Sequence, residues 1–200
     1  KPIVAVKSGG AARAYPSEGG EMTADSLEAL VEQTGIIRVD TLAQQLNVAR
    51  VLACQPLPAG VRVALVGNGG GSLALAADAC VDAGLTLATV GPGVREAVGE
   101  GGSGARLRAS TVDLGFEAGG DDLARALGAL LVDDGVDSVL VVCAPAPRQS
   151  TTELVAAVAS ARAEAPDKTL LACVFGQHPT AMSADGTADV PVFDFPDDAA

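Results

Sequence analysis

The sequence predicts an α/β protein with a doubly wound parallel sheet. Short apolar runs alternate along the chain with Ala- and Leu-rich segments of helical length, which is the pattern of strand–helix–strand units. Hydrophobic residues make up 48% of the 200 residues, but aromatic residues only 2%, so the core must consist of small aliphatic side chains. The 24 glycines follow no collagen-like period, and they therefore mark turns between elements.

The alternation is clearest from residue 61 onward. Predominantly apolar runs of this length are typical of parallel strands that are buried on both faces. The expected strands are Val61–Val66, Leu85–Val90, Val136–Val142, Thr169–Phe175 and Val190–Phe193. The expected helices are Ser72–Ala83, Asp121–Val132 and Thr151–Ala165, with a helical turn at Val94–Val98. Residues 100–113 are expected to form a Gly- and Ser-rich loop. Right-handed crossovers would place these helices on both faces of the sheet.

A smaller set of elements precedes residue 56. The pattern predicts a strand at residues 3–6, a helix from Thr23 to Gln33, a strand at 36–39 and a second helix capped by Asp40 or Thr41. Leu42, Leu46, Ala49 and Leu52 would form the apolar face of that second helix. Residues 55–60 contain Pro56 and Pro58 and are expected to form a linker between two domains, residues 1–55 and 60–200.

Charge and composition exclude several classes of function. The net charge of −12 and the isoelectric point near 4.3 argue against nucleic-acid binding, which requires Lys and Arg to neutralise phosphates. The longest apolar run is too short to span a membrane, so we expect a cytoplasmic protein. The four cysteines lie in apolar patterns without CxxC spacing, which predicts buried free thiols and no metal site: Cys54, Cys80, Cys143 and Cys173.

A glycine-rich loop joins the strand at residues 61–66 to the following helix. Backbone N–H groups at a helix start, together with the helix dipole, favour an anion, and glycines allow a ligand to approach closely. The residues expected to bind phosphate here are Asn68, Gly69, Gly70, Gly71 and Ser72. The loop has neither the GxGxxG spacing of a dinucleotide fingerprint nor the Lys-Ser/Thr of a P-loop. A tight turn that binds nothing is the alternative interpretation.

Several segments, in order along the chain, resemble the NDP-forming acyl-CoA synthetases, the superfamily of succinyl-CoA synthetase. Thr111-Val112-Asp113-Leu114 resembles the family's Asn-Pro-Val-Asp-Leu motif with its first two residues changed. The other matching segments are residues 1–9, 33–41, 62–70, 190–193 and 195–199. The resemblance implies that residues 1–55 are the C-terminal part of one flavodoxin-like subdomain and residues 60–200 a second one. It also implies that the chain is a fragment of a longer protein.

The resemblance implies a chemistry for the parent family. An acyl-CoA and phosphate give an acyl phosphate, a loop histidine takes the phosphoryl group, and a separate nucleotide-grasp domain passes it to ADP. Two helix N-termini hold the phosphohistidine, and Gly69–Ser72 would belong to the second of them. CoA thioester, phosphate and ADP or ATP are therefore ligands of the family. We expect the fragment alone to bind no cofactor, because the CoA-binding and nucleotide-grasp domains are missing partners.

The sequence departs from the family at the catalytic loop. Where the family has Ser-His-Thr-Gly, this chain has a shorter stretch with Ser17, Glu18, Gly19 and Gly20, and it contains no histidine. No catalytic residue is therefore assigned, and the fragment alone is expected to be inactive. We expect a degenerate, oligomeric, ligand-sensing or scaffolding module, such as those fused to GNAT protein lysine acetyltransferases. The alternatives are part of an active ADP-forming synthetase and a structural oligomerisation domain.

Four further residues are weaker candidates. His178, the only histidine, follows an expected strand but has no partner spacing, so an exposed loop position is favoured. Asp113 could orient its loop by accepting backbone N–H bonds. Arg106 and Arg108 are the cations nearest to a plausible cleft, although a solvated loop position is the simpler interpretation.

Overall fold

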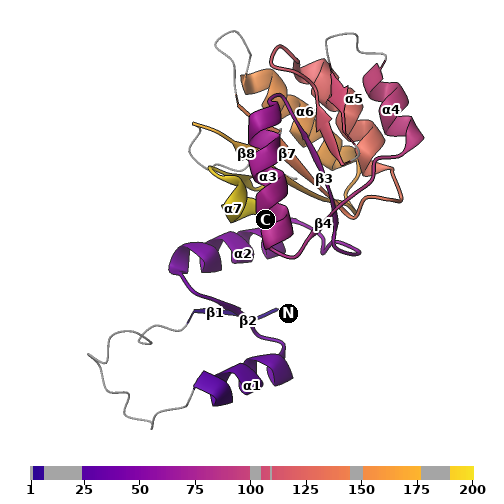
Figure 1. Cartoon of the computed structure of the whole chain (residues 1–200). Coiled ribbons are helices and arrows are strands. Elements are labelled where there is room, and N and C mark those ends of the chain that lie inside the picture. Colours follow the sequence, from indigo (N-terminus) through magenta and orange to yellow (C-terminus); the bar gives the residue numbers. More distant parts are fainter. Residues whose placement is uncertain (1, 7–23, 100–104, 109, 145–150, 177–189) are drawn as a thin grey trace. The chain divides into compact units, whose positions relative to one another are not determined.

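The computed structural model describes residues 2–6, 24–99, 105–108, 110–144, 151–176 and 190–200. The chain divides into two units, Lys1–Ala53 and Cys54–Ala200, and each is described here by itself (Figure 1). The expected histidine-loop residues 17–20 and His178 lie outside the described residues.

The larger unit is built on a seven-stranded sheet with the order β5-β6-β3-β7-β8-β9, in which β4 also pairs with β3. The strands are β3 (Arg62–Gly67), β4 (Thr86–Leu87), β5 (Arg106–Leu107), β6 (Thr111–Asp113), β7 (Ser138–Cys143), β8 (Thr169–Val174) and β9 (Val192–Phe193). All pairs are parallel except β5 with β6. The parallel strands β4-β3-β7-β8-β9 have the flavodoxin-like order 2-1-3-4-5, which confirms the expected fold class.

Two strands share one edge of β3. β4 pairs with its first half, where Arg62 is opposite Thr86, and β6 pairs with its second half, where Gly67 is opposite Asp113. β5 then pairs antiparallel with β6. The expected loop at residues 100–113 was therefore wrong over part of its length. β5 and β6 are only two and three residues long, and β6 forms by pairing with the edge of β3. The Gly- and Ser-rich sequence around them has no strand pattern of its own, so the sequence did not predict them.

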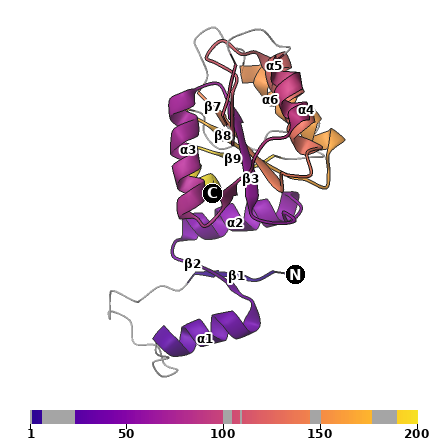
Figure 2. The ribbon, with the colours of Figure 1, turned by 45° about the vertical axis from the view of Figure 1, so that its right-hand side comes forward.

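Helices cover both faces of this sheet (Figures 1 and 2). They are α3 (Gly70–Asp82), α4 (Pro92–Gly99), α5 (Gly120–Leu131), α6 (Thr151–Glu164) and α7 (Pro196–Ala199). The larger buried cluster joins the sheet to α4, α5 and α6, and the smaller one joins its other face to α3 and α7. The largest fully buried side chains are all Leu or Val, as the aromatic-poor composition predicts.

The end of β3 lies unusually close to β7. A Cβ atom on Gly67 would lie 1.9 Å from the carbonyl oxygen of Val142. Because that obstacle is backbone in the middle of a sheet, it cannot move aside as a side chain could. Gly67 is thus required by the distance between two strands, whereas its φ is not positive.

An ion pair holds the opposite end of the β3–β7 strand pair. Arg62 donates from Nε to Asp137 Oδ2 (2.8 Å) and from Nη2 to Asp137 Oδ1 (2.6 Å), and its backbone N–H also bonds to Oδ2 (2.9 Å). The Arg62 guanidinium and this N–H hold the pKa of Asp137 down at about 2, below its ordinary value of 3.8. Asp137 is 8% exposed, so the pair fixes the start of β3 beside the start of β7.

The expected linker is partly tied to the larger unit. Gln55 is 8% exposed, and its Oε1 accepts the backbone N–H of Leu170 at 3.0 Å. The Thr169 hydroxyl donates to the carbonyl of Pro56 at 2.8 Å. Residues 55 and 56 are therefore held at the start of β8.

The smaller unit contains one parallel strand pair and two helices. They are β1 (Val4–Val6), α1 (Ala24–Thr34), β2 (Ile37–Val39) and α2 (Leu42–Cys54). Thr41 caps α2, since its Oγ1 accepts the N–H of Gln44 (3.1 Å), while Gln44 Oε1 accepts the N–H groups of Asp40 and Thr41 (2.9 and 3.1 Å). Of the two expected caps, Thr41 is therefore the residue that caps the helix.

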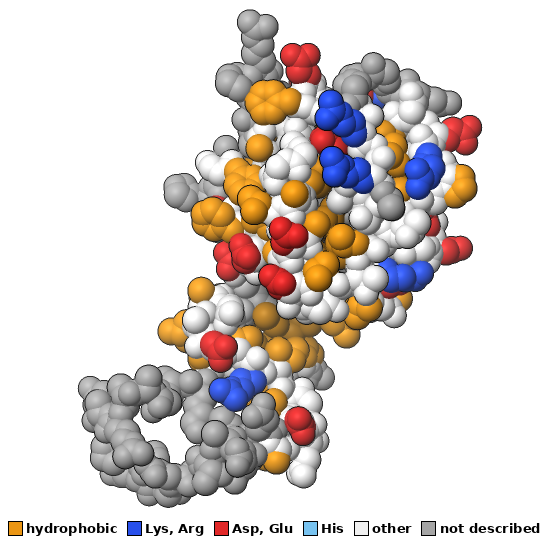
Figure 3. All heavy atoms as spheres, in the orientation of Figure 1, with side chains coloured by type: hydrophobic (Ala, Val, Ile, Leu, Met, Phe, Trp, Pro, Cys, Tyr) orange, Lys and Arg blue, Asp and Glu red, His pale blue; other side chains and the backbone are white. Residues whose placement is uncertain are grey.

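Among the side chains of this unit that the structure describes, no apolar residue is buried. No residue of α2 is buried, and Leu42 and Leu46, on its expected apolar face, are 68% and 70% exposed. Ile3 beside β1 is 60% exposed, and apolar side chains reach the surface of this unit in Figure 3. Two parallel strands with exposed helix faces cannot form an independent core.

Replacing Gly67 by Ala tests the close approach of β3 and β7. We expect the Gly67→Ala variant to lose about 3 kcal/mol of unfolding free energy, because the new methyl group meets backbone. Denaturant unfolding measures this. Gly128→Ala in α5 is the control, since nothing lies within 4 Å of its Cβ position and alanine favours a helix. Similar stability of the two variants would contradict the predicted obstruction.

The Arg62–Asp137 pair predicts a specific pH dependence. Because the pKa of Asp137 is lower in the folded chain, its stabilisation is complete above about pH 4 and is lost as the pH falls through about 2. We expect the stability difference between the unchanged chain and Asp137→Asn to shrink over that window, as measured by urea unfolding at each pH. Arg62→Gln should reproduce the effect. A difference that stays constant from pH 7 to pH 2 would contradict the ion-pair explanation.

Candidate functional site

The candidate site lies where β3 and β7 end side by side. After β3 the chain enters α3 on one face of the sheet, and after β7 it enters α6 on the other face (Figure 2). This is the topological switch point of the sheet, and ligands of open α/β sheets bind in the crevice outside the strand ends there. The glycine-rich loop Gly67–Ser72 lies at this point.

The start of α3 offers backbone N–H groups. Its N-cap, Gly69, is extended (φ −158°, ψ 115°) and no side chain caps the helix. The first helical bond runs from the N–H of Leu73 to the carbonyl of Gly69 at 3.0 Å. The N–H groups of Gly70, Gly71 and Ser72 therefore have no acceptor within the helix. They point with the helix dipole toward the loop, which is an arrangement that binds anions.

Asn68 has its side chain engaged in the structure of the loop. It is 2% exposed, its Nδ2 donates to the carbonyl of Ala144 (2.9 Å), and its Oδ1 accepts the N–H of Ala144 (2.8 Å). These two bonds fix the end of β3 to the end of β7. The sequence could not reveal this partner, because 76 residues separate the two positions.

The Ser72 hydroxyl is also used locally, since it donates to the carbonyl of Gly69 at 2.8 Å. Of the five residues predicted to bind phosphate, the two with polar side chains thus have them directed to the protein backbone. What the site offers a ligand is backbone N–H from the first turn of α3.

The glycines of the loop have different surroundings. A Cβ on Gly70 would lie 3.0 Å from Asp113 Oδ2, so a carboxylate lies beside the start of α3. Nothing lies within 4 Å of the Cβ position of Gly71. Gly71 therefore borders open space.

Asp113 was expected to orient the Gly- and Ser-rich loop before it, but the backbone bond that it accepts in the structure comes from the segment after it. Its Oδ1 accepts the N–H of Gly115 at 3.0 Å, and Gly115 has a φ of +86°, which favours glycine. Arg106 and Arg108 lie in and directly after the edge strand β5, next to β6, which carries Asp113. The structure thus brings three of the weaker candidates to the same corner as the glycine loop.

The cysteines form no reactive centre. None of the four described cysteines is in a disulfide; Cys80, Cys143 and Cys173 are buried, whereas Cys54 is half-buried. Burial raises the pKa of Cys80 to about 11 and that of Cys143 and Cys173 to about 12. These three thiols stay protonated near neutral pH, as expected of core residues. Among the described residues, no cluster of His, Cys, Asp and Glu is arranged to hold a metal ion.

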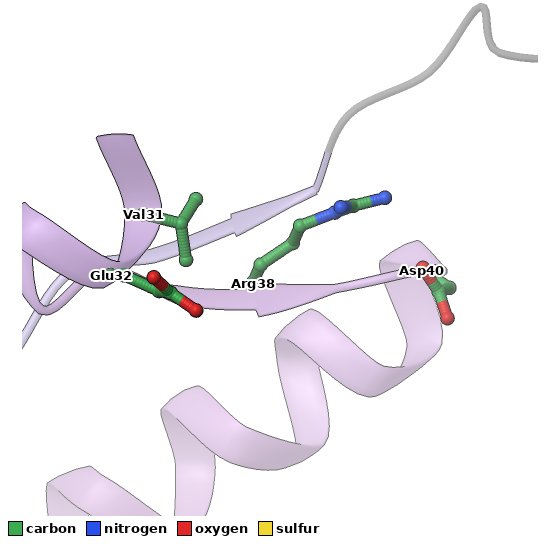
Figure 4. Close-up of a pocket in the computed structure, with 4 residues that line it drawn as sticks. All are labelled: Val31, Glu32, Arg38 and Asp40. Atoms are coloured by element: carbon green, nitrogen blue, oxygen red, sulfur yellow. The ribbon is translucent and has the colours of Figure 1, made fainter. Parts of the chain in front are cut away.

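Two hollows are lined by residues other than those of the glycine loop. One, of about 340 Å³, lies in the smaller unit between α1 and β2, and Figure 4 shows its four labelled side chains: Val31, Glu32, Arg38 and Asp40. The other, of about 100 Å³, lies between α5 and α6 and is lined mainly by small residues such as Gly128 and Ala161.

No described helix is long and apolar enough to cross a membrane.

No family model matches the chain, but individual proteins do. It is 30% identical over 181 residues to the 4-hydroxybutyrate–CoA ligase (ADP-forming) of Nitrosopumilus maritimus, covering 88% of this chain and 26% of the relative. It is 32% identical over 148 residues to the alpha subunit of acetate–CoA ligase (ADP-forming) II of Pyrococcus furiosus, covering 72% of this chain and 32% of that subunit. The chain thus spans between a quarter and a third of the length of these relatives.

Solved structures agree in fold. A crystal structure from Pyrococcus horikoshii OT3 covers 99% of this chain at 27% identity with a TM-score of 0.77, and the chain covers 43% of it. The apo dinucleotide-forming acetyl-coenzyme A synthetase 1 of Ca. Korarchaeum cryptofilum covers the whole chain at 19% identity with a TM-score of 0.84, and the chain covers 44% of it. Together with the sequence relatives, they show that this chain belongs to the NDP-forming acyl-CoA synthetase superfamily.

Proposed function

We propose that the first turn of α3 is a phosphate site and that this chain is a section of a degenerate acyl-CoA synthetase-like protein, which senses a ligand or acts as a scaffold. The observation that carries the proposal is the uncapped start of α3 at the switch point of the sheet, with the N–H groups of Gly70, Gly71 and Ser72 directed to the loop. Phosphate is a substrate class of the family to which the chain belongs.

The degenerate assignment rests on sequence. The segment that corresponds to the family's phosphoryl-carrier loop has Ser17, Glu18, Gly19 and Gly20 and no histidine. Carboxylates form acyl phosphates in some enzymes, but a carboxylate does not replace histidine as a stable carrier by simple analogy. A site that binds phosphate without a carrier would report on a ligand without transferring it. Such a module could serve a lysine acetyltransferase of the GNAT type.

The smaller unit supports the assignment as a section of a longer protein. Its two strands and two helices leave Ile3, Leu42 and Leu46 largely exposed and form no core of their own. We propose that residues 1–55 complete a flavodoxin-like subdomain whose other strands come from elsewhere in the parent. Residues 60–200 would then be the second such subdomain. The CoA-binding and nucleotide-grasp domains of the family would be its partners, in an oligomeric cytoplasmic protein.

Gly71→Ala separates binding from folding. The added methyl group meets nothing within 4 Å, and a helical Cβ tilts toward the helix N-terminus, where the ligand would lie. We expect Gly71→Ala to stabilise the ligand-free chain by about 0.5–1 kcal/mol and to weaken phosphate binding about tenfold, equivalent to about 1.4 kcal/mol. Phosphate titration followed by amide NMR shifts of residues 70–72 and by thermal unfolding measures both effects.

Gly128→Ala is the matched control, since it also adds a methyl group to an unobstructed helical glycine. It should gain stability without losing phosphate affinity. Unchanged amide shifts of residues 70–72 in the unchanged chain would remove the phosphate site and favour a structural role.

The catalytic alternative is favoured by one observation, the ligase names of the sequence relatives. The parent protein distinguishes the two. We expect the parent to bind acyl-CoA or nucleotide without forming ATP from acyl-CoA, ADP and labelled phosphate. ATP formation, with label retained covalently on the protein, would overturn the degenerate assignment in favour of an active ligase.

A further inference from the structure

We infer that residues 54–56 form a buried latch through which the order of α2 and the stability of the larger unit depend on each other, with Arg162 at its centre. The inference does not rest on the proposed phosphate site. That site is at the end of β3, whereas the contacts of the latch are made at the start of β8 and the end of α6.

The latch completes an edge of β8 that β9 leaves unpaired. Alternate residues along a strand direct their N–H groups to the same side, so those of Leu170 and Ala172 point to one edge. The N–H of Ala172 donates to the carbonyl of Pro191 (3.0 Å), where the pairing with β9 begins. The N–H of Leu170 lies before that pairing, and Gln55 Oε1 accepts it instead (3.0 Å). Leu170 is fully buried and Gln55 is 8% exposed, so a residue of the expected linker replaces a missing strand partner.

The next residue of the latch is held at the same place. Thr169 is 4% exposed, and its hydroxyl donates to the carbonyl of Pro56 at 2.8 Å. A residue before proline disfavours helical backbone, so Gln55 ends α2 at Cys54. The last turn of α2 is therefore followed directly by two residues that are bonded to the start of β8.

Arg162 joins the end of α2 to the end of α6. It lies in the last turn of α6 and is 9% exposed. Its Nη2 donates to the carbonyl of Cys54, the last residue of α2 (3.5 Å), and its Nη1 donates to the carbonyl of Ala165, directly after α6 (3.2 Å). Cys54 belongs to the larger unit, so both contacts lie within that unit.

The buried charge of Arg162 depends on these two carbonyls. Among the described residues it forms no ion pair, and its Nε has no hydrogen-bond partner. Carbonyls in the last turn of a helix carry the negative end of the helix dipole and stabilise a cation there. Because a buried guanidinium is costly without such compensation, the end of α2 stabilises the larger unit only while its last turn is formed.

The contacts therefore act in both directions. Unfolding of the last turn of α2 would withdraw the Cys54 carbonyl from Arg162 and displace Gln55, which leaves the buried N–H of Leu170 without its acceptor. In return, α2 buries none of its own residues, so its order depends on this attachment. A ligand or partner that orders α2 would thereby also stabilise the start of β8.

The test is a double-mutant cycle in the full chain, followed by hydrogen–deuterium exchange of the Leu170 amide. Ala49→Gly weakens α2 at an exposed position, and Arg162→Met removes the charge but keeps a long side chain. We expect Ala49→Gly to speed exchange at Leu170 about threefold or more when Arg162 is present, and to have no effect in the Arg162→Met background. Ala124→Gly, an exposed change in α5, is the control and should act equally in both backgrounds.

Gln55→Met breaks the latch while leaving Arg162 in place, and it replaces Arg162→Met in the cycle if that variant does not fold. It should speed exchange at Leu170 about tenfold or more, and change Ala172 far less, because the N–H of Ala172 is bonded to Pro191. Equal effects of Gln55→Met on these two amides would overturn the latch. So would a response of Leu170 to Ala49→Gly that is absent in the unchanged chain or is the same with and without Arg162.

Discussion

The contact between the ends of β3 and β7 is the constraint on which the candidate site depends. Gly67 brings the two strands so close that no side chain fits between it and the carbonyl of Val142. One residue later, Asn68 closes the same junction with two hydrogen bonds to Ala144. Because β3 and β7 then send their helices to opposite faces, this junction fixes where the sheet opens and where α3 begins. The position of the N–H groups that are proposed to bind an anion follows from it.

The opposite end of the same strand pair is held by charge. Arg62 and Asp137 join the beginnings of β3 and β7, while Gly67 and Asn68 join their ends. The two centre strands are thus fixed at both ends by interactions of different kinds. A site made of backbone N–H groups needs this support, because its donors cannot adjust by changing a rotamer. The rigid β3–β7 pair therefore positions these backbone donors, as packing would position the side chains of another kind of site.

Much of the larger unit could be predicted from sequence because its elements carry their own pattern. The strands β3, β7 and β8 are continuous apolar runs, and α3, α5 and α6 were expected within a few residues of their ends. The strands β5 and β6 could not be predicted, since their pairing depends on the unfilled edge of β3. Nor could the engagement of Asn68, whose polar side chain in a glycine-rich loop suggested a ligand contact. Long-range backbone partners leave no local signal.

The burial of the smaller unit could not be predicted from its sequence either. Its helices and strands were largely predicted, and Thr41 caps α2 as one of two expected residues. The apolar pattern of α2 also predicted a buried face, yet no residue of that helix is buried. The spacing of apolar residues predicts that one face of α2 packs against other residues. It does not predict whether those residues belong to this chain.

The start of α3 bears on whether the proposed phosphate site could bind a ligand without the family's histidine. A clamp built only to stabilise a phosphohistidine would have no remaining ligand once that residue was absent. Here the first turn of α3 is still uncapped, and Gly71 still borders open space. Gly128 in α5 is an equally unobstructed helical glycine, so the glycine at position 71 does not by itself indicate a ligand. The uncapped N–H groups at the start of α3 are the feature on which the proposal depends, because they offer donors to an anion whether or not a carrier residue is present. In the proposed function, recognition of the anion is therefore separated from phosphoryl transfer.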